Sequence, residues 1–354
     1  MNSHGQLFRI TTFGESHGIA LGVTIDGLPS NFLVDLENIR YELARRKPGQ
    51  STITTQRQEN DEDFEVLSGL FEGKSTGHPI TIIVRNKDQK SGDYDNIREI
   101  YRPNHADLTY SLKYGIRDHR GGGRSSGRET LSRVIAGAIA KQFLSEKLGI
   151  KIFAYTKQVA HIKGETIDQD HIEKNKLRCA DKNISDAMIH HVEEIQKDGN
   201  SIGGIIECIS QGVPAGLGEP VFDKIKSRLA SSMLSIGGVL GFEYGAGFDT
   251  IALTGKSYNE GFQNANGKIG SEHNRYNGVL GGITTGEDVI FRVAIKPTSS
   301  IYSEQKTVDI NGNAVNFAIT GRHDPCILPR VAPVIEAMTA IDILDLYLLN
   351  RSKH

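Results

Sequence analysis

The spacing of apolar residues near the start of the chain predicts two strands followed by a helix. Residues 7–13 and 19–26 are apolar stretches of strand length joined by a short glycine-flanked turn, which indicates a hairpin. Apolar residues then recur at helical spacing over residues 36–43, directly after Asp35 and before Pro48. Aspartate is a preferred N-cap residue and proline often follows a helix, so we expect a helix between them.

The strongest helical pattern begins near Leu131. Apolar side chains share one face of this segment, and small residues leave little bulk on the opposite face, so we expect burial on most sides. The apolar face comprises Leu131, Val134, Ile135, Ala138, Ile139 and Phe143, and the small residues are Ala136, Gly137 and Ala140. This helix is therefore the predicted centre of the core.

The remaining elements alternate less regularly. Helices are predicted at residues 187–197, 220–233 and 333–349, and strands at 201–210 and 288–295. Strands toward both ends of the chain with helices between them favour an α+β fold over a doubly wound sheet. We expect a single domain over residues 1–354, with a more polar peripheral segment near 150–200.

Composition narrows the class of protein. The chain has 354 residues and a formal net charge of −2, with no basic tail, which argues against a nucleic-acid or membrane-surface partner. Its three cysteines are too few for a disulfide framework, which favours a reducing cytoplasm. Neither a signal sequence nor a run of about 18 apolar residues is present, so export and membrane spanning are not expected.

A glycine run over residues 120–130 leads directly into the predicted central helix. Glycines allow close approach of the main chain, and a helix start offers unpaired N–H groups to an anion. Ser126 and Glu129 have the spacing of a capping box. Four arginines, Arg117, Arg120, Arg124 and Arg128, add cations suited to phosphate. The alternative is a surface turn before a capped helix.

The segment Gly14-Glu15-Ser16-His17-Gly18 matches the G-x-S-x-G pattern of serine hydrolases. That enzyme class is not favoured, because too little chain precedes Ser16 to build the parallel sheet that such an elbow needs. His17 is instead a candidate general acid, since imidazole titrates near neutral pH. The alternative is a histidine hydrogen-bonded within its own turn.

Three further polar segments offer complementary chemistry. His105 lies in a polar turn, and residues 296–300 supply a lysine and three hydroxyl groups after a predicted strand. Asp324 precedes Pro325, so it is either a proton-transfer group or a helix N-cap. The histidines lack metal-site spacing, so no metal is expected. Neither a P-loop nor a convincing dinucleotide fingerprint occurs, so an ordinary P-loop or Rossmann protein is not expected. The residues together indicate a cation-rich pocket for a phosphorylated ligand, with two histidines for proton transfer.

Five of these segments resemble segments of the chorismate synthase family, in the same order. They are residues 11–18, 102–107, 121–130, 296–300 and 321–326. The resemblance implies a lyase that eliminates phosphate from 5-enolpyruvylshikimate 3-phosphate to form chorismate, the last step of the shikimate pathway, with reduced FMN as cofactor. It also implies a β-α-β sandwich, with helices between two antiparallel sheets, assembled as a homotetramer.

The resemblance also implies roles for individual residues. His17 would protonate the departing phosphate, and His105 would set the protonation of the reduced flavin. Asp324, with Ser16 and Ser126, would assist proton movement around the flavin. Residues that match FMN-binding positions are Arg124, Ser125, Ser126, Gly237, Gly238, Gly281, Lys296, Pro297, Thr298, Ser299, Ser300 and Arg322.

Arg46 matches an arginine assigned to NADP binding, so NADPH is a candidate flavin reductant. Thr52 stands where many members carry a basic residue, which favours reduction of the flavin by an external system. Gly237 and Gly238 also depart from the usual family residues. The alternative function is a non-catalytic protein that binds flavin or a phosphorylated metabolite on the same scaffold, and a turnover assay separates the two.

Overall fold

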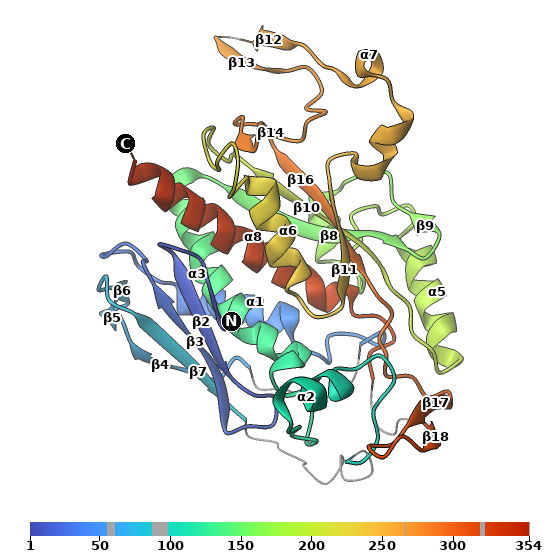
Figure 1. Cartoon of the computed structure of the whole chain (residues 1–354). Helices are drawn as coiled ribbons and strands as arrows, with labels where there is room; N and C mark the ends of the chain where they lie inside the picture. Colours follow the sequence, from blue (N-terminus) through green and yellow to red (C-terminus); the bar gives the residue numbers. More distant parts are fainter. Residues whose placement is uncertain (55–60, 87–97, 266, 319–322, 354) are drawn as a thin grey trace.

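Two antiparallel sheets enclose a layer of helices in the computed structural model, which describes residues 1–54, 61–86, 98–265, 267–318 and 323–353 (Figure 1). The first sheet has the strand order β1 (Ser3–His4), β2 (Arg9–Gly14), β3 (Ala20–Asp26), β7 (Ile80–Arg85), β4 (Phe64–Ser68). The second has the order β11 (Val239–Tyr244), β16 (Val289–Ile295), β10 (Gly204–Gln211), β8 (Lys151–Val159), β9 (Ile162–Lys163). The predicted α+β class and the layering implied by the family resemblance are both confirmed.

The other elements lie between or around these sheets. The longer helices are α1 (Leu36–Arg46), α2 (Asp107–Tyr114), α3 (Thr130–Leu148), α5 (Ser185–Lys197), α6 (Ile225–Leu234) and α8 (Leu328–Arg351). Short helices are η2 (Gly123–Ser125), η3 (Gly127–Glu129), α4 (Gln169–Ile172), η4 (Gly247–Ala252) and α7 (Gly255–Tyr258). Two-stranded ribbons pair β5 (Leu70–Phe71) with β6 (Lys74–Ser75), β12 (Phe262–Ala265) with β13 (Lys268–Ser271), β14 (Val279–Leu280) with β15 (Ile283–Thr284), and β17 (Gln305–Val308) with β18 (Ala314–Phe317).

The opening of the chain folds as its pattern predicts. β2 and β3 form an antiparallel hairpin whose register runs from the Arg9–Asp26 pair to the Gly14–Leu21 pair. The Asp35 carboxylate caps α1 by accepting hydrogen bonds from the main-chain N–H groups of Glu37 and Asn38. Local sequence therefore fixes both elements, as expected for turn and cap signals.

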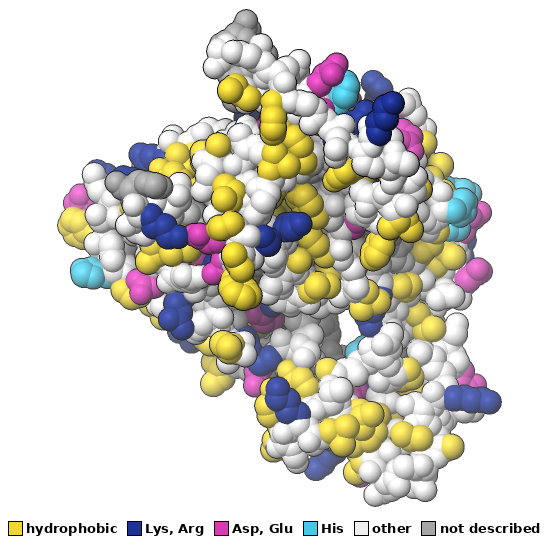
Figure 2. All heavy atoms as spheres, turned by 45° about the horizontal axis from the view of Figure 1, so that its top comes forward, with side chains coloured by type: hydrophobic (Ala, Val, Ile, Leu, Met, Phe, Trp, Pro, Cys, Tyr) yellow, Lys and Arg dark blue, Asp and Glu magenta, His cyan; other side chains and the backbone are white. Residues whose placement is uncertain are grey.

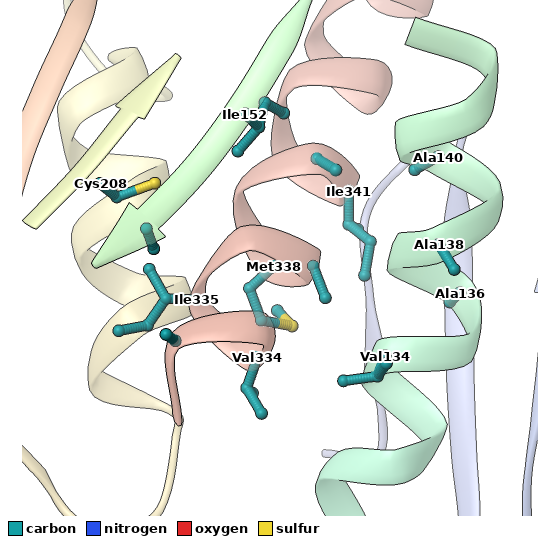
Figure 3. Packing of buried hydrophobic residues seen from close by; sticks show 14 of the residues in the cluster. Val134, Ala136, Ala138, Ala140, Ile152, Cys208, Val334, Ile335, Met338 and Ile341 are labelled. Atoms are coloured by element: carbon teal, nitrogen blue, oxygen red, sulfur yellow. The ribbon is translucent and has the colours of Figure 1, made fainter. Parts of the chain in front are cut away.

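Close packing of α3 against α8 forms the centre of the core (Figure 3). Small residues on α3 let the helices approach, and at the closest point a Cβ placed on Gly137 would lie 2.2 Å from the Cβ of Ala337. Any larger residue at position 137 would force the helices apart. The buried cluster also includes strand residues of both sheets, so the two helices join the sheets into one core.

Helix α8 begins five residues before its predicted start and contains Pro333 in its interior. Proline lacks the N–H that would bond to the carbonyl four residues earlier, which here is that of Pro329. The Arg178 guanidinium donates to this carbonyl instead. A side chain from another part of the fold thus compensates for the break that the sequence rule predicts.

Two other predicted segments differ from the observed elements. The helix expected over residues 220–233 begins only at Ile225, and Val221 lies before it and is 65% exposed. The polar segment near 150–200 begins with β8, whose residues Ile152, Ala154 and Val159 belong to the core cluster. The peripheral part of the segment therefore begins only after β8, where it contains the two-residue strand β9 and the helices α4 and α5.

Candidate active site

The glycine run covers the turn that carries Ser16 and His17. This turn joins β2 to β3, and the Ser16 hydroxyl lies 3.1 Å from Nδ1 of His17. A Cβ at Gly121 would lie 2.2 Å from the same nitrogen and 3.0 Å from the Ser16 Oγ. Glycine at position 121 therefore permits the run to pack directly on both side chains. His17 has a hydrogen bond within its own turn, as the alternative reading expected, but it also lies against the predicted anion-binding run.

Ser126 caps a short helical turn at the end of the run. Its hydroxyl accepts from the Arg128 N–H at 3.2 Å and so caps η3, after which α3 begins at Thr130. The predicted reciprocal bond from Glu129 is not formed. The Glu129 carboxylate accepts instead from the Thr12 hydroxyl at 2.8 Å and from Arg133 Nε at 2.9 Å. The capping-box prediction is thus correct for the serine and wrong for the glutamate.

Each of the four arginines around the glycine run faces a carboxylate of the protein. The pairs are Arg117–Asp107 at 3.2 Å, Arg120–Asp118 at 2.7 Å, Arg124–Glu129 at 3.7 Å and Arg128–Asp61 at 3.0 Å. Arg124 also donates to the carbonyls of Thr12 and Gly14, each at 3.1 Å. The positive charge of these arginines, which the sequence analysis assigned to a phosphorylated ligand, is therefore largely compensated by carboxylates of the protein.

Arg46 lies in the interior, 1% exposed, and binds the fully buried Asp61. Its Nη2 donates to Asp61 Oδ2 at 2.7 Å, and its Nη1 donates to the Gly127 carbonyl at 3.2 Å. Arg46 is therefore not an exposed cation, because a buried carboxylate requires a buried cation. Arg46 thereby fastens the end of α1 to the glycine run. Thr52 faces Lys176, whose Nζ donates to the threonine hydroxyl at 2.9 Å.

His105 meets the segment of residues 296–300, as the motif set implied. Its Nδ1 lies 2.9 Å from the Pro103 carbonyl, which requires the proton on Nδ1, and its Nε2 lies 3.2 Å from the Ser300 hydroxyl. Burial lowers the pKa of His105, and the positive charges of Arg102 and Lys296 lower it further. The ring is therefore neutral near pH 7, with Nε2 as an acceptor.

Lys296 is held by neutral groups. Its main-chain N–H donates to the Gly238 carbonyl at 2.9 Å, while its ammonium donates to the Ser299 hydroxyl at 2.6 Å and the Asn104 carbonyl at 3.2 Å. Burial lowers the pKa of Lys296. In the described part of the chain, the groups that bind its ammonium include no carboxylate. A Cβ at Gly237 would meet no atom within 4 Å, so space lies open beside this turn.

Asp324 does not cap α8. The helix begins at Leu328 with Ile327 at the N-cap, so the N-cap alternative is wrong. The Asp324 carboxylate pairs instead with Arg330 at 2.5 Å, and its main-chain carbonyl accepts from the Thr298 hydroxyl at 2.8 Å. Asp324 thus joins the segment that contains Lys296 and Pro297. Arg322 lies outside the described residues.

Gly281 lies apart from the other candidate residues. It occupies the turn between β14 and β15, where its carbonyl accepts from Lys224 at 3.4 Å. Lys224 immediately precedes α6 and Gly237 follows it, so the length of this helix, about 15 Å, separates the two glycines. β14 accordingly lies in the upper part of Figure 1, whereas α2, which begins two residues after His105, lies in the lower part. Within one chain, Gly281 is not brought to Lys296.

Several residues with structural roles at this site gave no sequence signal of their own. One is Arg330, which pairs with Asp324, and another is Asp61, which pairs with Arg46. The third is Tyr110, whose hydroxyl lies 3.0 Å from the Ser125 hydroxyl. Across the described residues, no three histidine, cysteine, aspartate or glutamate side chains lie close enough to hold a metal ion. No helix in that same part of the chain has the length and apolar character needed to cross a membrane.

Comparisons with known proteins identify the family of the chain. The family model described as chorismate synthase matches residues 8–348. The chorismate synthases of Cytophaga hutchinsonii and Bacteroides fragilis are each 51% identical to the chain, and each comparison covers 99% of it and 98% of the relative. A crystal structure of chorismate synthase superposes with a TM-score of 0.77 at 29% identity, covering 98% of this chain and 93% of that one. The chain belongs to the chorismate synthase family.

Proposed function

We propose that the chain eliminates phosphate from 5-enolpyruvylshikimate 3-phosphate to form chorismate, with reduced FMN as cofactor. The observation that carries the proposal is that segments distant in sequence are joined by hydrogen bonds. Arg124 binds the Gly14 carbonyl, His105 meets Ser300, and Thr298 binds the Asp324 carbonyl. These contacts place the turn of His17 near the glycine run, and His105 and Asp324 near residues 296–300. In our proposal the two groups form one site, with two histidines, a carboxylate and a lysine held by neutral groups.

The residues around Lys296 fit a phosphorylated flavin. A partly desolvated ammonium without a carboxylate partner among the described residues favours an anion, and the hydroxyls of Ser299 and Ser300 lie in the same segment. The open space beside Gly237 leaves room for a ring, and Gly238 binds the Lys296 N–H. Reduced FMN held by these residues would supply electron density as phosphate leaves and would accept the hydrogen lost from the substrate ring.

Side chains of this protein then handle the protons. His17 protonates the departing phosphate, with Ser16 at its Nδ1 fixing the orientation of the ring. His105 is neutral and holds its proton on Nδ1, so Nε2 can accept a proton through the Ser300 hydroxyl. Asp324, with Ser16 and Ser126, moves a proton at the flavin side of the site. These assignments follow the family resemblance and the hydrogen bonds of each residue.

We further propose that the flavin is reduced by an external system. The support is the buried Arg46, whose charge is compensated by Asp61, and the neutral Thr52 at a position where many members carry a basic residue. NADPH alone would then not reduce the flavin, and turnover would still require a chemical or photochemical reductant. Anaerobic assays with and without NADPH, using oxidised FMN at the start, test this point.

The decisive experiment is anaerobic turnover with photoreduced FMN. We expect chorismate and phosphate in equal amounts, with no net consumption of flavin, since the elimination needs no oxidant. Turnover with oxidised FMN under the same conditions, or flavin oxidation in proportion to product, would contradict the proposal. FMN binding without any turnover would favour the non-catalytic alternative.

We also propose a cytoplasmic homotetramer. Large apolar side chains are exposed around β11, α6 and η4. Hydrophobic side chains form several separate patches on the face of the molecule seen in Figure 2. Phe222, Leu240, Phe248 and Ile251 are 85%, 72%, 79% and 86% exposed in the single chain. Exposed apolar surface of this kind marks association sites. Light scattering after gel filtration should give four times the mass of one chain, and a monomer would contradict the proposal.

A further inference from the structure

We propose that Arg330 is a positioning residue, which holds Asp324 in the orientation needed for proton transfer. This inference rests on the proposed function, because it assigns a partner to a residue that acts in that reaction. Arg330 lies in the first turn of α8, six residues after Asp324. Within the described part of the chain, its guanidinium bonds to Asp324 and to the Arg46 carbonyl and not to residues 296–300, so its effect passes through the aspartate.

The contacts of the guanidinium carry the proposal. Arg330 Nη1 lies 2.5 Å from Asp324 Oδ2, and the two side chains are only 18% and 11% exposed. Its Nε donates to the Arg46 carbonyl at 3.2 Å. A planar guanidinium can make both contacts at once with little freedom, whereas a lysine ammonium is a single point of charge.

These two contacts join separate parts of the site. The Arg46 side chain itself binds the Gly127 carbonyl, so Arg330 connects Asp324 through α1 to the glycine run that holds Ser126. The peptide that carries Asp324 is fixed as well, because Thr298 donates to the Asp324 carbonyl and Ile202 N–H donates to the Pro325 carbonyl at 2.9 Å. With the main chain held, the ion pair with Arg330 fixes the direction of the Asp324 Oδ2 atom.

A purely structural role would predict something different. An ion pair that only stabilised the start of α8 would change the melting temperature in proportion to any loss of activity. A positioning role predicts instead that the rate constant falls while ligand binding and the fold remain. It also predicts that Arg330 matters only while position 324 carries a carboxylate.

The test is a double-mutant cycle with photoreduced FMN. The variants are Arg330→Gln, Asp324→Asn and the combination, with Arg330→Lys as the conservative variant. Arg351→Gln, at the exposed far end of α8, serves as the control for removing one arginine from this helix. Each protein is measured for kcat, KM for the phosphorylated substrate, FMN affinity and melting temperature.

We expect Arg330→Gln to lower kcat by about 10-fold to 10²-fold, the scale of a misplaced catalytic group, with KM and FMN affinity nearly unchanged. Arg330→Lys should recover part of that loss. Asp324→Asn should lose at least about 10²-fold, and the combination should be no slower than Asp324→Asn alone. Arg351→Gln should match the wild type.

Two results would overturn the proposal alone: an unchanged kcat in Arg330→Gln, or losses that multiply in the combination. If Arg330→Gln does not fold, Arg330→Met replaces it in the same cycle with the same criteria. Full turnover in Asp324→Asn would refute both the role of Asp324 and that of Arg330. An inactive wild type with bound reduced FMN would refute the proposed function itself.

Discussion

The two sides of the candidate site differ in how their cations are compensated. On the arginine side, which comprises Arg46, Arg117, Arg120, Arg124 and Arg128, every guanidinium faces a carboxylate of the protein. On the lysine side, which comprises residues 296–300 with Asn104 and His105, the ammonium is bound by a hydroxyl and a carbonyl. The sequence is richest in cations on the first side, yet among the residues that the structure describes more charge is left without a carboxylate on the second side.

This difference shows that the number of cations in a motif does not predict where an anion binds. A carboxylate already present offsets most of the attraction that an arginine would offer to phosphate, and the buried pair serves to hold segments together. A partly desolvated lysine with neutral partners gains most from a new anion, because the anion restores the favoured charged form. We therefore expect the arginine side to support the fold and the lysine side to bind the ligand.

The largest expected effect is on stability, from Arg46→Met. This change leaves the fully buried Asp61 with one cation fewer, and breaking a buried ion pair costs about 3–5 kcal/mol. Because Arg128 also pairs with Asp61, we expect the lower end of that range in the urea unfolding free energy. Arg85→Met, which removes an exposed ion pair with Glu65, is the control and should leave the midpoint nearly unchanged. Equal effects of the two substitutions would remove the structural role of Arg46.

The next effect concerns the glycine run. Gly121→Ala places a methyl group against His17 Nδ1 and Ser16 Oγ, so one or both side chains must move. A misplacement of about 1 Å can cost about 10²-fold in rate, and we expect a loss of that size in kcat. Gly127→Ala is the matched control, since its Cβ would meet no atom within 4 Å. Activity retained by Gly121→Ala would show that the position of His17 is not essential.

The smallest effect is the pH dependence of stability contributed by His105. Burial lowers its pKa in the folded state below the ordinary value of about 6.5, so as the pH falls the unfolded chain binds this proton first. The stability that the neutral ring contributes is full above that ordinary value and is lost as the pH falls toward the folded pKa. Between pH 7.5 and 5.5 the melting temperature of His105→Gln, measured by calorimetry, should therefore fall less than that of the wild type. Parallel curves would contradict the burial argument.

Sequence patterns predicted those features that depend on neighbouring residues. The hairpin of β2 and β3, the Asp35 cap and the apolar face of α3 each follow from signals within about a dozen residues. The α+β class followed from the order of elements, whereas the enclosed helical layer came from the family resemblance. The two histidines were found because glycine and polar neighbours mark turns.

The remaining features depend on contacts between distant segments. Arg128 and Asp61 lie far apart in sequence, so no local pattern shows that the charges compensate each other. Pro333 stays inside α8 because Arg178 takes the carbonyl that proline leaves without its usual donor. Asp324 lies before a sequence typical of a helix start, yet Arg330 fixes its carboxylate and α8 begins later. Tertiary contacts override the local rule in each case.

The contrast between the two sides is tested most directly by FMN affinity in two matched variants, Lys296→Met and Arg128→Met. Loss of a charge-assisted hydrogen bond is worth about 1.5–3 kcal/mol, so Lys296→Met should raise the FMN dissociation constant by about 10-fold to 10²-fold. Its melting temperature without ligand should stay near that of the wild type. Arg128→Met should lower the melting temperature and leave the dissociation constant nearly unchanged. The reverse pattern, or equal losses of affinity, would contradict the account.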